Sequence, residues 1–567
     1  MSVLETISLC SIAFFASAIS DSEKILKSKY LVYIVNSFDM QYLLNSNNLI
    51  ITISITVFCI ITAKNVLYAV FNYWSIRFSV LIEAIFAEKL MSGFINMPYE
   101  WHLSQNSSDL ILVSANWKVY IGRKFIYSFL HLVADALLVL IMLSTLLVVQ
   151  PLVSIIVIII LGSTSFFLFT SVRKKLDKVA IIGRRCDQNI YKQATKIIHG
   201  FKDLKIANKQ NVFVQQYRNI LLDFSKVHAT QQVIMETPKW TLETMGFFMI
   251  SFSICFMLIF LDYSLARISG TITLLAVTAW RVLPALKGIL SQITSIRNSL
   301  PYINKILNYL DEIIQNEIKY CATTVSKSKK HLDFTNNIII NNVSFVYNNA
   351  THFALENINL TIQKGSIIGI IGPSGAGKST FVDILSGLLF PSKGNILIDE
   401  KEINTFDLRM MWMNKLGYVP QTPYIFDGTI AENIAFETNQ HNIDKNCVMN
   451  CCNMAAMRDF LDDLPEGINS YIGERGVRLS GGQRQRISIA RTLYQKPDLI
   501  IFDEATSALD YENEQSIQNT IYSLRGKQTM VIVAHRLTTV ESCDFIYELE
   551  KGKIKRVGTP QTILNIK

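Results

Sequence analysis

One apolar run limits what this chain can fold into more than any other feature. Residues 151–172, PLVSIIVIIILGSTSFFLFTSV, contain no charged side chain. A helix that crosses a bilayer needs about 20 mainly apolar residues, which is the length of this run. Four more segments are mainly apolar over a similar length, and a weaker sixth includes Glu5: residues 48–72, 125–149, 240–262, 268–294 and, as the weaker one, 3–20. Residues 1–300 are therefore expected to form an all-α, multi-pass membrane domain.

The net charge of +9 raises the question of a nucleic-acid partner, and its placement argues against one. Residues 173–239 hold fourteen Lys and Arg against five acids, and they lie between apolar runs. Basic residues gather in cytoplasmic loops of membrane proteins. We therefore predict a cytoplasmic loop and no nucleic-acid binding. The nine cysteines form no paired CxxC motif and are expected to be reduced thiols, and no cleavable signal peptide is evident.

Two long polar segments, residues 73–124 and 173–239, are helix-like and are expected to run from the membrane into the cytosol. Each contains a break, near 97–110 and 201–212. Short helices at these breaks could contact a cytosolic domain, although ordinary loops would fit the sequence equally well.

The pattern changes after a linker predicted over 301–335, which includes the polar run SKSKKHLDFTNN. Apolar strands such as GSIIGII, PDLIIFDE and KQTMVIVAHR then alternate with helical segments. This order predicts a parallel α/β sheet over residues 336–567, with its chemistry at the strand ends.

The strongest local motif is GPSGAGKST, residues 372–380, between a strand and a helix. It matches the P-loop pattern, in which backbone N–H groups close around phosphates at a helix N-terminus. The lysine reaches the β- and γ-phosphates and the serine hydroxyl can bind Mg²⁺. The predicted nucleotide-binding residues are Gly372, Ser374, Gly375, Gly377, Lys378, Ser379 and Thr380.

Polar residues at other strand ends complete a hydrolytic site. Asp503 would hold Mg²⁺, and Glu504 would act as the general base on the attacking water. His535 ends a strand near the expected γ-phosphate, although a lone histidine can also be a solvated residue. Gln421 could bind the metal or the water, and Tyr347 could stack on adenine or be a half-exposed strand aromatic.

A second phosphate-binding turn follows at LSGGQ, residues 479–483. The hydroxyl of Ser480 and the N–H groups of Gly481 and Gly482, followed by Gln483, begin the helix QRQRISIARTLY. One nucleotide already has its P-loop, so this turn should serve a nucleotide held by another copy. Two copies arranged head to tail would place each LSGGQ over the other copy's γ-phosphate.

Taken in order, the P-loop, the glutamine loop, LSGGQ, FDEATSALD and the histidine resemble the nucleotide-binding domain of ATP-binding-cassette transporters over about 335–567. The membrane half resembles the six-helix exporter type. The resemblance implies ATP hydrolysis with Mg²⁺, coupled to transport by a half-transporter that dimerises, with itself because every motif is intact. It also implies roles for Tyr347 (adenine), Gln421 (coupling), Asp510 (communication across the dimer) and residues 473–476, GERG (contact with the cytoplasmic loops).

A closer resemblance is to bacterial flippases for lipid-linked oligosaccharides, through VLETISL, INMPYEWHLSQNSSDLI and AWRVLPALKGIL. It implies a bacterial inner membrane, a cytoplasmic ATPase domain and an amphipathic lipid cargo. Such exporters normally have more residues before the first span. Here Met1 falls where that helix should already be in the membrane, which indicates a shortened helix or a misassigned start.

Charges inside the apolar runs bear on the cargo, because a charge at mid-depth costs several kcal/mol unless it faces a cavity or a partner. Lys64, Arg281 and Lys287 could line a basic cavity for a pyrophosphate-linked lipid, or they could snorkel or pair between helices; Asp135 and Glu243 also need partners. The alternative cargo is a peptide, another lipid or a drug-like compound. A non-transporting regulatory ATPase is disfavoured by the complete set of catalytic motifs.

Overall fold

The computed structural model describes residues 7–8, 11–12, 15, 46–149, 151–260, 265–323, 332–347, 350–505, 511–534 and 536–564. The chain divides into two compact units. The first comprises Met1–Met97 with Ser104–Gln315, and the second comprises Pro98–Leu103 with Asn316–Lys567. Each unit is described by itself.

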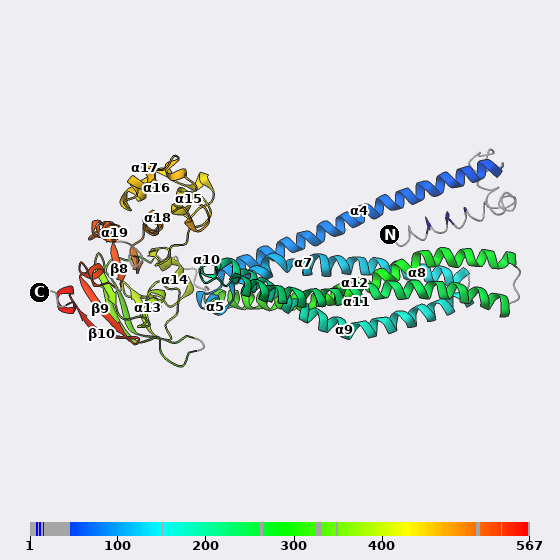
Figure 1. Ribbon diagram of the computed structural model, residues 1–567, viewed down its shortest axis with the longest axis horizontal. Coiled ribbons are helices and arrows are strands. Elements are labelled where there is room, and N and C mark those ends of the chain that lie inside the picture. The colour runs from blue at the N-terminus through cyan, green and yellow to red at the C-terminus, as the bar shows by residue number, and fades with distance from the viewer. Residues whose placement is uncertain are drawn as a thin grey trace. The chain divides into compact units, whose positions relative to one another are not determined.

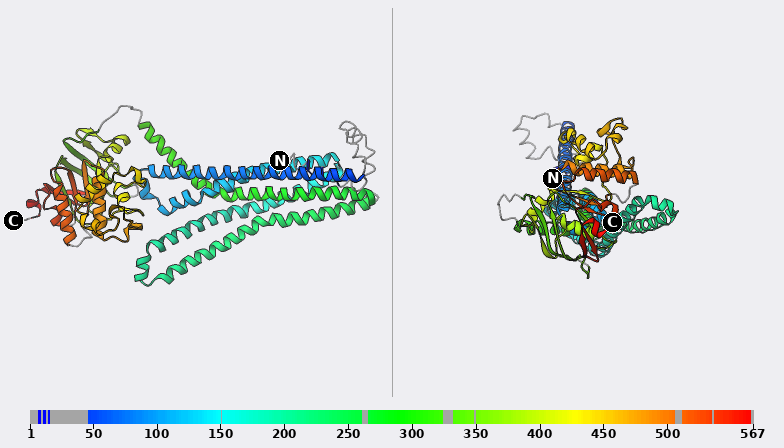
Figure 2. Two further views of the ribbon diagram at one scale, coloured as in Figure 1. Left: turned by 90° about the horizontal axis from the view of Figure 1, so that it is seen from above. Right: turned by 90° about the vertical axis from the view of Figure 1, so that its left-hand side faces the viewer.

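The first unit is built from long helices that lie side by side (Figures 1 and 2). They are α4 (Ser46–Asn96), α8 (Tyr127–Val149), α9 (Pro151–His199), α11 (Gln210–Phe260) and α12 (Leu265–Thr323). Each of the five stronger predicted spans falls mainly within one of these helices. Among the described residues, the segments Asn47–Asn96 and Lys118–Thr145 are long and apolar enough to cross a membrane. The predicted span 3–20 lies almost wholly outside the described residues.

Shorter helices occupy the two predicted breaks. The first holds α5 (Tyr99–Ser104) and α6 (Ser107–Ile111), and the second holds α10 (Phe201–Ile206), which joins α9 to α11. Two π-helical turns, η2 (Leu112–Asn116) and η3 (Gly122–Ile126), flank α7 (Lys118–Ile121) before α8 begins. Helix α5 groups with the second unit, where the N–H of Phe390 donates to Glu100 Oε1 at 3.3 Å.

The boundary between the units lies inside the predicted linker over 301–335, although the first part of that segment is helical. Helix α12 continues to Thr323 because one of its faces remains apolar. Tyr302, Ile306, Tyr309 and Ile313 recur at helical spacing and are all buried. The unit boundary accordingly falls at residues 315–316.

Buried polar contacts join the helices of the first unit. The Tyr302 hydroxyl donates to Asp187 Oδ2 at 2.9 Å, while its ring stacks on Tyr120 with centroids 3.6 Å apart. Arg123 Nε and the buried carboxylate of Glu83 form an ion pair at 2.9 Å. These contacts link α12 to α9 and α7, and η3 to α4.

The second unit contains the predicted α/β fold, with a six-stranded sheet in the order β10-β9-β3-β8-β7-β6 (Figure 1). Its strands β3 (Ile367–Ile371), β6 (Leu416–Val419), β7 (Leu499–Asp503), β8 (Thr529–Val533) and β9 (Phe545–Glu550) are parallel, and β10 (Lys553–Gly558) is antiparallel. An antiparallel sheet in the order β2-β1-β4-β5 completes the strands: β1 (Asn337–Phe345), β2 (Leu355–Gln363), β4 (Lys393–Ile398) and β5 (Lys401–Glu402).

Two apolar cores cover opposite faces of the six-stranded sheet. Along β7, Ile500 and Phe502 belong to one core, whereas Leu499 and Ile501 belong to the other. Neighbouring strand residues point to opposite faces, so the four apolar residues of β7 serve both cores. The helices of this unit are α13 (Lys378–Leu385), α14 (Phe406–Met413), α15 (Ile430–Ala435), α16 (Lys445–Met454), α17 (Arg458–Asp462), α18 (Gly481–Tyr494), α19 (Tyr511–Ser523) and α20 (Pro560–Ile563), with 3₁₀ turns at 440–442, 467–469, 474–476 and 537–540.

Candidate active site

The P-loop connects β3 to α13, and its glycines are required by its shape. Gly372, Gly375 and Gly377 have φ of 155°, 79° and 100°. A Cβ atom on Gly372 would overlap the Leu549 carbonyl oxygen, and one on Gly377 would crowd the Ala354 carbonyl oxygen. The loop can therefore adopt this shape only with glycine at positions 372 and 377.

Lys378 begins α13 and is buried within this loop. Its ammonium donates to the Gly372 carbonyl at 2.9 Å and to the Pro373 carbonyl at 3.2 Å. Burial lowers the pKa of Lys378, while the carboxylates of Glu504 and Asp503 oppose that change. The ammonium thus lies where the loop, the helix N-terminus and two acids meet.

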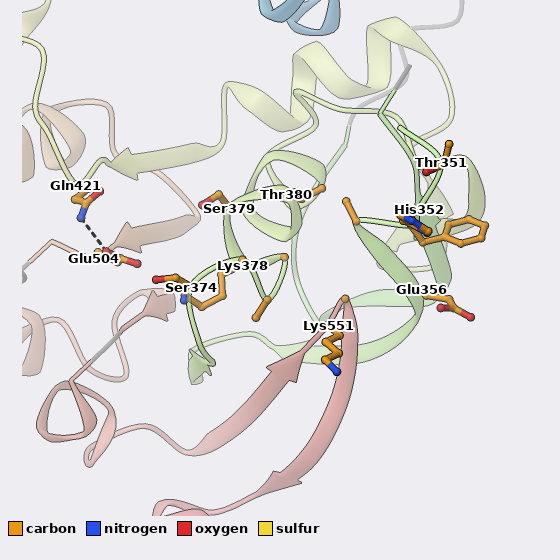
Figure 3. A pocket seen from close by; sticks show the side chains of 16 residues that line it. Thr351, His352, Glu356, Ser374, Lys378, Ser379, Thr380, Gln421, Glu504 and Lys551 are labelled. Carbon is orange, nitrogen blue, oxygen red and sulfur yellow. Dashed lines mark hydrogen bonds between the residues drawn. The ribbon is translucent and has the colours of Figure 1, made fainter. Parts of the chain in front are cut away.

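The P-loop forms one side of a cleft of about 940 Å³ (Figure 3). Ser374, Lys378 and Ser379 lie on that side with Gln421 and Glu504 beyond them, and residues 351–354, Glu356 and Lys551 line the opposite end. Most of the residues predicted for phosphate binding therefore share one cleft with Gln421 and Glu504. The lining by residues 351–354 and Lys551 carried no sequence signal.

The predicted base and the predicted glutamine are in direct contact. Gln421 Nε2 donates to Glu504 Oε2 at 2.8 Å (Figure 3). Glu504 follows the end of β7 with φ of 50°, and its N–H donates to the Val533 carbonyl on β8 at 2.9 Å. This left-handed conformation is unusual for a residue with a side chain.

Asp503 has a partner that sequence reasoning did not identify. The hydroxyl of Tyr418 on β6 donates to Asp503 Oδ2 at 3.0 Å. Burial and the nearby Asp503 raise the pKa of Tyr418, so this hydroxyl keeps its proton. Burial and Asp503 also raise the pKa of Asp383 on α13 to about 6. Acidic groups therefore gather at this edge of the sheet.

Tyr347 lies next to the P-loop helix. Its hydroxyl is hydrogen-bonded to the Thr380 Oγ1 at 3.0 Å, and its ring packs edge-on against Phe345. The residue is 36 % exposed. The described residues that line the cleft include Thr351, His352 and Phe353, but not Tyr347.

The LSGGQ turn caps α18. The Ser480 hydroxyl accepts the Gln483 N–H at 3.2 Å, and Gln483 Oε1 accepts the Ser480 N–H at 2.8 Å. The N–H groups of Gly481 and Gly482 lie in the first helical turn, where no helical carbonyl can accept them. The end of the helix thus offers donors and a positive dipole to an anion.

Helix α18 is also tied to the glutamine loop. Gln485 Nε2 donates to the Pro420 carbonyl at 3.1 Å, and Arg491 donates to the carbonyls of Asn433 and Tyr424. Pro420 directly precedes Gln421. Hydrogen bonds therefore connect the helix that follows LSGGQ to the glutamine loop within one copy of the chain.

Several predicted residues lie outside the described part of the chain. His535 and Asp510 are both outside it. Arg281 falls within α12, but its side chain is not described. Lys64 is buried in α4 and Lys287 is exposed on α12. Sequence-based roles for these residues stay predictions.

Comparison with known proteins agrees with this geometry. Residues 355–507 match the ABC transporter family model, so the second unit carries an ABC transporter domain. The chain also has the fold of a bacterial Atm1-family ABC exporter with ATP bound, with a TM-score of 0.76 and 20 % identity over all of this chain and 94 % of that one.

Curated relatives match over part of the chain. The ATP-dependent lipid A-core flippase of Idiomarina loihiensis is 34 % identical over 52 % of this chain and 49 % of its own length, and that of Coxiella burnetii is 37 % identical over 48 % and 44 %. The alpha-hemolysin translocation ATP-binding protein HlyB of Escherichia coli is 39 % identical over 41 % and 32 %. The chain thus spans a third to a half of the length of these relatives.

Proposed function

We propose that this chain is an ATP-driven exporter or flippase that works as a dimer and moves a lipid-linked oligosaccharide or a related lipid. The observation that carries the proposal is the contact of 2.8 Å between Gln421 and Glu504 in the cleft that the P-loop forms. A base and a water-orienting amide in one phosphate-binding cleft suit hydrolysis of a nucleoside triphosphate.

The residues present fit Mg²⁺ as a cofactor. Mg²⁺ prefers oxygen ligands and is commonly bound by one or two carboxylates together with substrate phosphates. Ser379 and Asp503, with Gln421, would hold it, and it would neutralise charge on the transferred phosphoryl group. Among the described residues no cluster of three or more His, Cys, Asp or Glu could hold a metal alone. A site shared with the nucleotide is consistent with that finding.

The roles of the protein residues follow from their positions. Lys378 binds the β- and γ-phosphates, and Tyr347 stacks on adenine. Glu504 takes a proton from the attacking water, which Gln421 orients. His535 contacts the γ-phosphate from the next strand.

A second copy would complete each site. Ser480, Gly481, Gly482 and Gln483 of one copy bind the γ-phosphate held by the other copy, and Asp510 communicates across the dimer. Both copies are the same chain, because all of these motifs occur in it. Closure around ATP changes the opening of the membrane cavity, through the breaks near 97–110 and 201–212.

The proposed cargo rests on the resemblance of the membrane half and on relatives that act on lipids. Two of the matched proteins are named as lipid A-core flippases. We place the chain in a bacterial inner membrane with its ATPase domain in the cytoplasm. The HlyB match favours one alternative, export of a peptide, and a drug-like compound belongs to the same alternative class.

The test is ATP-dependent movement of a fluorescent polyprenyl-pyrophosphate oligosaccharide in proteoliposomes. Glu504→Gln should lower the rate of ATP hydrolysis by about 100-fold or more, because it removes the general base. Glu356→Gln is the matched control, since Glu356 lines the same cleft but pairs with Lys553 at 3.1 Å. If the chain hydrolyses ATP but does not move the lipid, the cargo belongs to the alternative class of peptides and drug-like compounds. An unchanged rate in Glu504→Gln would refute the catalytic role.

A further inference from the structure

A row of polar side chains lies inside the first unit, where helices α4 and α8 pass each other. On α4, Lys64, Tyr68 and Asn72 recur every four residues and therefore share one face. On α8, residues 127, 131 and 135 (Tyr, His and Asp) have the same spacing. We call these six residues the polar seam. Both rows lie in the two segments that are long and apolar enough to cross a membrane.

The two rows face each other in an antiparallel register. The Tyr127 hydroxyl donates to Asn72 Oδ1 at 3.1 Å, and the His131 ring lies 5.6 Å from that of Phe71. These two contacts place Tyr127 and His131 of α8 beside the segment of α4 that contains Phe71 and Asn72.

A third helix approaches at the end of the seam. A Cβ atom on Gly288 of α12 would overlap Asp135 Oδ2, so this carboxylate lies directly against the α12 backbone. Farther along α8, Met142 packs in an apolar cluster with Val282. At that level, α8 and α12 meet through apolar side chains.

One side chain of the seam, His131, has a buried nitrogen without a hydrogen-bond partner among the described residues. His131 is 6 % exposed, and its Nε2 has no hydrogen-bond partner among the described residues. A buried polar atom without a partner costs about 1–3 kcal/mol. A seam that served only to hold two helices together would be expected to satisfy this atom. Tyr68 is 48 % exposed, so the seam also reaches the surface of the unit.

The composition of the seam points to a ligand class. It carries one positive and one negative side chain, so it is balanced for charge. Its phenol, amide and imidazole groups can both donate and accept hydrogen bonds. An anionic phosphate would be repelled by Asp135. The hydroxyl groups of a sugar both donate and accept hydrogen bonds, as the phenol, amide and imidazole groups of the seam do.

We infer that the polar seam binds the sugar portion of the cargo on its way across the membrane. This inference rests on the proposed function, which supplies a cargo with a sugar headgroup. Ionisable groups within membrane helices commonly mark the path of a substrate. In the seam, His131 Nε2 bonds a sugar hydroxyl.

The inference is tested by equilibrium binding of two fluorescent lipids to the full chain in nanodiscs without ATP. One is the polyprenyl-pyrophosphate oligosaccharide, and the other is the same polyprenyl pyrophosphate without sugars. His131→Phe keeps the ring contacts but removes both ring nitrogens. We expect it to weaken binding of the sugar-bearing lipid by about five- to tenfold and to leave that of the sugar-free lipid unchanged.

Tyr127→Phe is a milder second variant and should shift the same ratio in the same direction. Ser144→Ala is the control, since Ser144 is exposed on α8 and bonds only its own helix. Equal loss for both lipids, or no change for either, would overturn the inference. So would a wild-type chain that does not bind the sugar-bearing lipid.

Lipid movement with ATP is measured separately. If His131→Phe still moves the lipid and binds the sugar-bearing lipid with unchanged affinity, the role of the seam is refuted and the transport proposal stands. If binding depends on His131 but ATP moves no lipid, the transport proposal is refuted and the role of the seam stands.

Discussion

The hydrogen bond from Tyr418 to Asp503 leads to a prediction about Mg²⁺ dependence. Tyr418→Phe removes the hydroxyl that donates to Asp503 Oδ2 at 3.0 Å and keeps the ring. A hydrogen bond to a charged group contributes about 1.5–3 kcal/mol. Because the Tyr418 side chain is 44 % exposed, we take the lower end of that range. The carboxylate loses its fixed orientation, so the half-saturating Mg²⁺ concentration should rise about tenfold.

The measurement is a Mg²⁺ titration of ATP hydrolysis by the reconstituted chain, repeated as Mn²⁺ binding in the presence of ATP. The second readout separates metal affinity from the rate of hydrolysis. Tyr424→Phe is the matched control, because Tyr424 is an exposed tyrosine in the loop that follows β6. A Mg²⁺ midpoint in Tyr418→Phe within twofold of the wild type would refute the positioning role.

Two further predictions concern the nucleotide-binding domain. Burial alone would raise the pKa of Asp399, but hydrogen bonds from Thr335, Asn336 and Asn337 lower it to about 2. The ionised carboxylate therefore stabilises the folded state fully above pH 4, and this stabilisation is lost as the pH falls toward 2. Asp399→Asn should therefore lower the thermal midpoint at pH 7 and flatten its dependence between pH 4 and 2; an unchanged pH profile would contradict this. Gly372→Ala should weaken ATP binding at least tenfold in a nucleotide-binding assay, since a Cβ atom would overlap the Leu549 carbonyl oxygen; wild-type affinity would show that the loop can adapt.

Residues close together in the sequence were the ones that could be predicted from it. The P-loop, the acids after β7 and the LSGGQ turn each combine a short pattern with one strand end or helix start. The glycines with positive φ and the capping of α18 by Ser480 and Gln483 follow from the same local rules.

Residues brought together by pairing between elements were missed. Tyr418 meets Asp503 only because β6 and β7 are parallel neighbours in the sheet. The polar seam likewise depends on the register between α4 and α8, although the four-residue spacing within each helix is visible in the sequence. The start of the linker is a different case. The helical spacing of Tyr302, Ile306, Tyr309 and Ile313 is visible in the sequence, but the charged run that follows these residues favours a linker more strongly than their spacing favours a helix.

The central claim is that two copies of the chain share each ATP, and mixing two inactive variants tests it most directly. Lys378→Ala disables the P-loop and Ser480→Arg disables the LSGGQ turn. If each site joins the P-loop of one copy to the LSGGQ of the other, a mixed dimer contains one site with both changes and one intact site. Random pairing then restores about a quarter of the wild-type rate of ATP hydrolysis. If each copy uses its own LSGGQ, no dimer has an intact site, and the mixture stays as inactive as either variant alone.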